Sequence, residues 1–68
     1  MPDRDATIAD ALELIALNQN ALGAAIEEIS RWVLERGSQN VHVNVLSALQ
    51  TIDINAEGIA NAIKLLRR

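Results

Sequence analysis

The sequence contains no cysteine, tyrosine or phenylalanine, and Trp32 is its only aromatic residue. The lack of cysteine excludes a disulfide framework and a thiolate metal site, both of which commonly stabilise very small domains. The shortage of aromatic residues, together with only three glycines and one proline, argues against a β-sandwich or barrel. Association with another chain therefore remains as a means of stabilising so short a sequence.

Long hydrophobic runs are also missing. No apolar run approaches the roughly 20 residues that a membrane-spanning helix needs. Residues 1–5 lack the basic segment and apolar core of a signal peptide. We therefore expect a soluble, cytoplasmic protein without membrane association. The net charge of -3 argues against nonspecific binding to nucleic acid.

The sequence is rich in aliphatic residues, and these residues recur at regular spacing. Its 68 residues form one domain at most, and half of them are hydrophobic. Apolar residues recur at alternating steps of four and three between Asp5 and Arg36, with Gln19 as the one polar member, which predicts a first helix over about residues 5–36. This predicted seam consists of Ile8, Leu12, Ile15, Gln19, Leu22, Ile26, Ile29 and Val33.

The same spacing returns after a short break. Gly37 can adopt the left-handed conformation that ends a helix, and Ser38 or Asn40 can cap the next one, which places a turn at residues 37–40. A second helix is predicted over about residues 41–66. Its seam consists of Val45, Leu49, Ile52, Ala56, Ile59, Ile63 and Leu66.

The two seams match when the chain folds back about residue 39, since apolar residues then oppose each other along the whole length. The sequence thus predicts an all-α, antiparallel two-helix hairpin. The same fold-back would bring Asp3 and Asp5 near Arg67 and Arg68, which suits both helix dipoles.

Two alternatives remain open for the second half. Residues 41–45 and 51–55 alternate in polarity like short strands. A break near Asp53 or Asn55 would instead create a separate last helix capped by Asn55.

A lone hairpin leaves the outer side of each seam in water, and half-covered aliphatic side chains stabilise it too little to offset the entropy of ordering the chain. We therefore expect a homo-oligomer, most simply a dimer that forms a four-helix bundle resembling a coiled coil. The residues expected at this oligomer interface are Leu14, Gln19, Ala25, Trp32, Leu46 and Ala60. Gln19 is expected to form a buried polar layer with its symmetry mate.

Three apolar residues of the second helix, Val43, Ile54 and Leu65, recur every eleven residues on the side away from its seam. Bordered by polar and small residues, they form a possible surface for a protein partner or for a higher oligomer.

Residues with catalytic or metal-binding chemistry are scarce. His42, the only histidine, has no carboxylate at helical metal-site spacing and is expected to be an exposed residue in the first turn of the second helix. No nucleophile, base and acid stand at recognisable positions, and no glycine-rich phosphate loop is present. We expect no enzyme activity, no metal and no cofactor.

These observations favour a small interaction or oligomerisation module, acting as an adaptor or regulator. The alternative is a nucleic-acid-binding regulator built as a dimer of helical hairpins. Its candidate contacts would be the C-terminal basic residues Lys64, Arg67 and Arg68, for which a helix-dipole role is expected instead because no aromatic residue lies among them.

Overall fold

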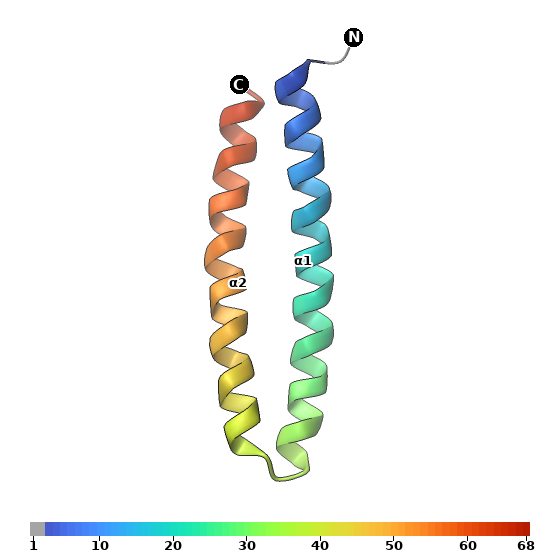
Figure 1. The fold of residues 1–68 in the computed structure, drawn as a ribbon, viewed down its shortest axis with the longest axis vertical. Helices are drawn as coiled ribbons and strands as arrows, with labels where there is room; N and C mark the ends of the chain where they lie inside the picture. The colour runs from blue at the N-terminus through green and yellow to red at the C-terminus, as the bar shows by residue number, and fades with distance from the viewer. Residues whose placement is uncertain (1–2) are drawn as a thin grey trace.

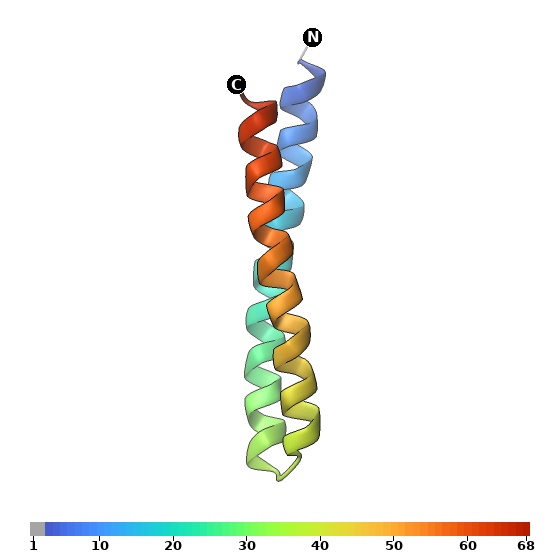
Figure 2. The same cartoon turned by 90° about the vertical axis from the view of Figure 1, so that its left-hand side faces the viewer.

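Two long helices lie side by side and antiparallel in the computed structural model, which describes residues 3–68 (Figure 1). Helix α1 spans Arg4–Glu35 and helix α2 spans Gln39–Leu66. The hairpin is narrow, with extents of 54 × 17 × 10 Å between Cα atoms, and α2 crosses in front of α1 at a small angle in Figure 2. The predicted all-α antiparallel hairpin is confirmed.

Both ends of α1 satisfy free backbone groups locally. Asp3 caps the N-terminus, because its side chain accepts a hydrogen bond from the amide of Asp5 at 3.3 Å. At the C-terminus the amides of Gly37 and Ser38 donate to the carbonyls of Leu34 and Val33, at 2.9 and 3.2 Å. This pattern is a Schellman motif. Gly37 has a φ of 98°, which confirms its predicted left-handed conformation.

Helix α2 runs without interruption from Gln39 to Leu66. The structure contains neither the alternative strands at residues 41–45 and 51–55 nor the alternative break near Asp53. Ser38 is the N-cap residue of α2, but its side chain makes no capping hydrogen bond. Residues 41–45 and 51–55 therefore follow the helical spacing of apolar residues and not the local alternation in polarity.

The register of the hairpin differs from the predicted one. The turn closes over Arg36 to Ser38. Ser30 meets His42 at 2.9 Å and Gly23 lies beside Leu49, so the fold-back is centred near residue 36 and not near residue 39. The reason is the tight Schellman turn, which uses fewer residues than the expected turn.

Helix α1 meets α2 through small residues. Along α1 the buried or half-buried positions at heptad spacing are Ala9, Leu12, Ala16, Gln19, Gly23, Ser30 and Val33. Five members of the predicted seam are instead exposed: Ile8, Ile15, Leu22, Ile29 and, least of all, Ile26 at 37%. Ile8, Ile15, Leu22 and Ile29 each directly precede a small residue that replaces them in the contact. The predicted seam of α1 is thus wrong at these positions, and α1 is rotated by about one residue.

The seam predicted for α2 is confirmed. Its members all lie at half-buried positions facing α1: Val45, Leu49, Ile52, Ala56, Ile59, Ile63 and Leu66. Large side chains of α2 therefore pack against small ones of α1, as where Gly23 lies beside the Leu49 side chain. Small residues allow two backbones to approach closely, so this pairing closes the hairpin tightly.

Replacing Gly37 with alanine should destabilise the hairpin by about 1 kcal/mol, because a side chain at positive φ is strained. Gly37→Asn should cost less, since asparagine tolerates this conformation best among the other residues. Denaturation in urea at a fixed protein concentration measures both changes. Equal stability of Gly37→Ala and the unmodified chain would contradict the Schellman turn.

Substitutions at Gly23 test the rotation of α1. A Cβ atom there would lie 3.8 Å from Leu49 Cδ2, an ordinary contact, so Gly23→Ala should stabilise the protein by about 0.5–1 kcal/mol through helix propensity. Gly23→Leu should lower the thermal midpoint, because a large side chain would push the helices apart. The control Ala24→Leu places the same leucine side chain at an exposed position and should be tolerated. Equal tolerance at both positions would contradict the observed seam.

Candidate interaction surface

The hairpin has two long faces, one on each side of the contact between its helices, and they differ in chemistry. One face carries no charged side chain along α1 from Ile8 to Trp32 or along α2 from Val41 to Leu65, and only at the turn does the guanidinium of Arg36 lie over Trp32; we call it the uncharged face. Helix α1 contributes the stripe Ile8, Ile15, Leu22 and Ile29 to it, flanked by Ala11, Asn18, Ala25 and Trp32. The four stripe residues are 42–63% exposed, although they are among the largest aliphatic side chains of α1.

Helix α2 completes the uncharged face with shorter side chains. The equivalent stripe consists of Val41, Ala48, Asn55 and Ala62, flanked by Asn44, Thr51, Gly58 and Leu65. The uncharged face is therefore built unevenly, with bulky aliphatic residues along α1 and mostly small or polar residues along α2.

A shallow groove opens on the uncharged face near its middle. It has a volume of about 220 Å³ and is lined by Ile15, Ala16, Gln19, Ile52, Asn55, Ala56 and Ile59. The lining is mainly apolar, with the amides of Gln19 and Asn55 as its polar groups. Gln19 is half-buried in the contact between the helices, beside the apolar residues of α2. Its predicted bond to a symmetry mate stays a prediction.

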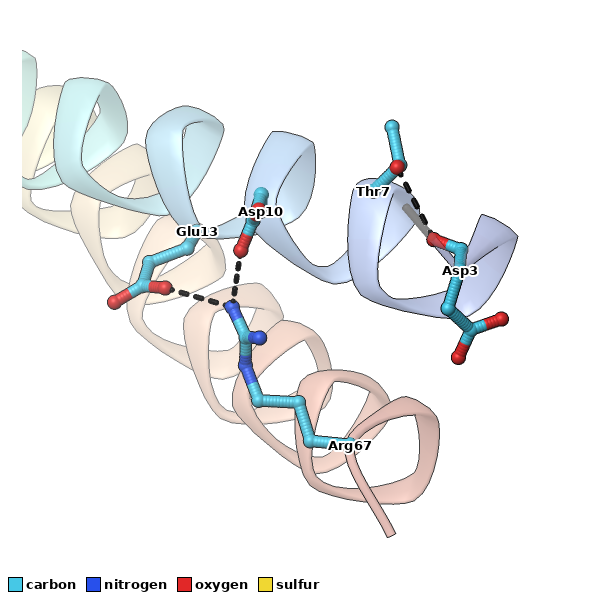
Figure 3. Close-up of polar contacts among 5 residues, drawn as sticks. All are labelled: Asp3, Thr7, Asp10, Glu13 and Arg67. Atoms are coloured by element: carbon cyan, nitrogen blue, oxygen red, sulfur yellow. Dashed lines mark hydrogen bonds and ion pairs between the residues drawn. The ribbon is translucent and has the colours of Figure 1, made fainter. Parts of the chain in front are cut away.

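The opposite face, which we call the charged face, holds the longer-range ion pairs. Arg67 reaches from the end of α2 to two carboxylates of α1, Asp10 at 2.7 Å and Glu13 at 3.0 Å, as Figure 3 shows. These contacts raise the pKa of the Arg67 guanidinium, chiefly through the hydrogen bond to Asp10. Arg67 thus pairs with Asp10 and Glu13 and forms no ion pair with Asp3 or Asp5 in the described residues, because its long side chain extends from the end of α2 back along α1.

Near the turn, the seam contains a polar pair that the sequence did not indicate. Buried Ser30 and half-buried His42 hydrogen-bond at 2.9 Å between the hydroxyl and the ring Nδ1. The expected solvent exposure of His42 is therefore wrong. The pair satisfies two polar groups inside the contact and links the helices directly behind the turn.

Three of the six basic side chains make charged or aromatic contacts within the hairpin. Arg67 binds the two carboxylates, Arg31 lies 3.7 Å from Glu27, and the guanidinium of Arg36 lies 4.7 Å from the ring centroid of Trp32. The last contact is a cation–π interaction between residues one helical turn apart. A phosphate-binding surface needs several free cations along one face, and these three are engaged elsewhere.

The six residues predicted for the oligomer interface lie on different faces of the hairpin. Ala25 and Trp32 lie on the uncharged face, and Gln19 lies in the seam beneath it. Leu46 and Ala60 belong to the side of α2 that borders the charged face, and Leu14 is exposed on the back of α1. One flat contact cannot cover all six residues.

The residues predicted for a partner surface are exposed: Val43, Ile54 and Leu65 have exposures of 60–66%. They lie on the side of α2 that faces away from α1, with Leu65 at the edge of the uncharged face. Their role in binding stays a prediction.

The candidate surface residues that sequence reasoning missed are those of the α1 stripe, because the predicted seam assigned them to the interior of the hairpin. The sequence did contain a pattern that could have identified the true contact, in the residues that follow each member of the stripe. Ala9, Ala16, Gly23 and Ser30 are small residues repeated every seven positions, a pattern typical of close helix contact. Two adjacent heptad stripes, one large and one small, indicate a helix that contacts two neighbours.

Comparisons with protein-family models, curated proteins and solved structures found no match to this chain. Within residues 3–68, neither helix has a segment long and apolar enough to cross a membrane. The same residues contain no group of three or more His, Cys, Asp or Glu side chains that could hold a metal ion. The candidate site is the uncharged face, because the α1 stripe is exposed there.

Proposed function

We propose that this chain is a small, non-enzymatic oligomerisation module, in which two hairpins bury their uncharged faces against each other as a four-helix bundle. The observation that carries the proposal is the α1 stripe: Ile8, Ile15, Leu22 and Ile29 lie exposed on a face whose neighbouring helix positions carry no charged residue. Contiguous exposed apolar surface of this kind is typical of interaction sites.

The surface area supports association. A compact monomer of 7.4 kDa is expected to expose about 4,200 Å². This chain exposes 5475 Å². The excess of about 1,300 Å² exceeds the roughly 800 Å² that each partner buries in an interface of standard size. A second layer of helices would bring the exposed area per chain close to that of an ordinary small domain.

The distribution of charge supports the same face. Charged residues are depleted from the centres of protein interfaces, where they would lose solvation. Here the carboxylates and cations of the helix bodies, such as Glu13, Glu27, Asp53 and Lys64, lie on the charged face or on the outer surfaces. A dimer formed through the uncharged face would keep all of them in water.

Interaction is favoured over chemistry and over nucleic-acid binding by what the surface offers. The groove around Gln19 contains amides and aliphatic groups but no acid, base or nucleophile. The guanidinium of Arg67, from the C-terminal basic cluster, is engaged by Asp10 and Glu13. An adaptor or regulator would use the dimer as a scaffold, with the outer surfaces of α1 and α2 left for other contacts.

The matched substitutions Leu22→Gln and Leu17→Gln test the proposal. Both leucines lie on α1 with similar exposure, 54% and 59%, but only Leu22 lies on the uncharged face. Burial of a leucine contributes roughly 1.5–3 kcal/mol, and a dimer contains two copies of the site. Leu22→Gln should therefore raise the dimer dissociation constant at least about 100-fold, which sedimentation equilibrium over a range of concentrations measures.

Leu17→Gln is the control and should leave the dissociation constant unchanged within experimental error, because its side chain stays in water in both states. Circular dichroism should show the same helix content for Leu17→Gln as for the unmodified protein at every concentration. An equal response of the two variants would contradict association through the uncharged face.

A further inference from the structure

The uncharged face can meet a second copy of itself in two ways. If the twofold axis runs parallel to the helices, α1 of each chain lies on α2 of the other and both turns are at the same end. If the axis runs across the helices, α1 lies on α1, α2 lies on α2, and the turns are at opposite ends. Both arrangements satisfy the symmetry of a closed dimer, so the side chains must decide between them.

We propose that the two hairpins dock with their turns at the same end, α1 of each on α2 of its partner; this inference rests on the proposed function. The first reason is the uneven construction of the face. Bulky side chains such as Ile15 and Leu22 run along α1, whereas residues such as Ala48 and Ala62 run along α2. Helices approach to about 8–10 Å according to the size of the side chains between them.

With α1 on α2, the large residues of the α1 stripe lie mostly against the smaller residues of the α2 stripe, and both contacts have the same spacing. With like helices paired, the α1 contact would be crowded by large side chains facing each other, and the α2 contact would leave a gap between small ones. Gaps and overpacking both destabilise an interior. A second copy of this chain therefore complements the face only in the first arrangement.

The register of the hairpin gives the second reason. A rotation about an axis parallel to the helices keeps every residue at its own height. The contacts of Gly23 with Leu49 and of Ser30 with His42 define these heights within each chain. They place Ile15 at the height of Glu57, next to Gly58 and between Asn55 and Ala62 of α2.

Space is available at the position where Ile15 would dock. No atom lies within 4 Å of a Cβ built at Gly58, so this part of α2 is open. By the same heights, Leu22 docks between Ala48 and Asn55, and Ile29 docks between Val41 and Ala48. Each large side chain of the stripe thus enters a hole between successive side chains of the partner helix, as in coiled-coil packing.

Polar groups give the third reason. Asn18 and Asn55 are uncharged-face residues on different helices, and the register places them at nearly the same height. In the proposed arrangement each Asn18 lies opposite Asn55 of the partner subunit, so the two amide pairs can hydrogen-bond across the interface. Buried amide pairs of this kind fix the register of helical assemblies.

Distances between spin labels test the orientation. Because the chain has no cysteine, the single substitution Asn40→Cys attaches one label per chain at the turn end of α2, at an exposed position. With both turns at the same end, the two labels should lie about 30 Å apart, from helix spacings of about 10 Å plus the label arms. With turns at opposite ends, the length of α2 separates them by at least about 42 Å, at 1.5 Å per residue.

Asn20→Cys, an exposed position near the middle of α1, is the control, because both arrangements give it a short distance. A measurable distance at position 20 with a short distance at position 40 supports the proposed orientation. A measurable distance at position 20 with a long one at position 40 overturns the orientation and leaves dimerisation intact. No dipolar coupling at either position overturns the orientation together with the proposed function.

Discussion

The close approach of α1 to α2 through small residues is the constraint from which the rest of the structure follows. Ala9 and Ser30 are buried at this contact, and Gly23 lies against the side chain of Leu49. Because the small stripe of α1 occupies the contact, the adjacent stripe of large residues is excluded from it. The hairpin therefore closes tightly at the expense of leaving Ile15, Leu22 and their equivalents in water, where they destabilise an isolated chain.

The uncharged face follows from this arrangement of the two α1 stripes. Its apolar residues are continuous with the seam, since Ile52 and Ile59 line both the contact and the groove beside it. A helix that buries one stripe against its partner and exposes the next is typical of a four-helix bundle, in which each helix has two neighbours. The ion pairs of Arg67 lie on the opposite face, so they secure the ends of the hairpin without obstructing a second layer.

The fold was predictable from the sequence because it depends on periodicity and on one turn. The heptad spacing of α2 and the left-handed Gly37 identified both helices and their order. The rotation of α1 was not predictable from hydrophobicity alone, because isoleucine is more hydrophobic than alanine and Ile15 was therefore preferred over Ala16 for the seam. The choice depends on how closely the backbones approach, and this is a property of the pair of helices. The hydrogen bond between Ser30 and His42 was missed for the same reason, since it follows from the register.

The central claim is that the large stripe of α1 is covered by a second copy of the chain. Sedimentation equilibrium of the unmodified protein at micromolar concentration tests it most directly. If two chains bury the α1 stripe in a dimer, the measured mass should be about twice the chain mass of 7.4 kDa, and the high helix content should fall on dilution. A monomer that remains fully helical on dilution would contradict it, because the exposed stripe would then need no cover.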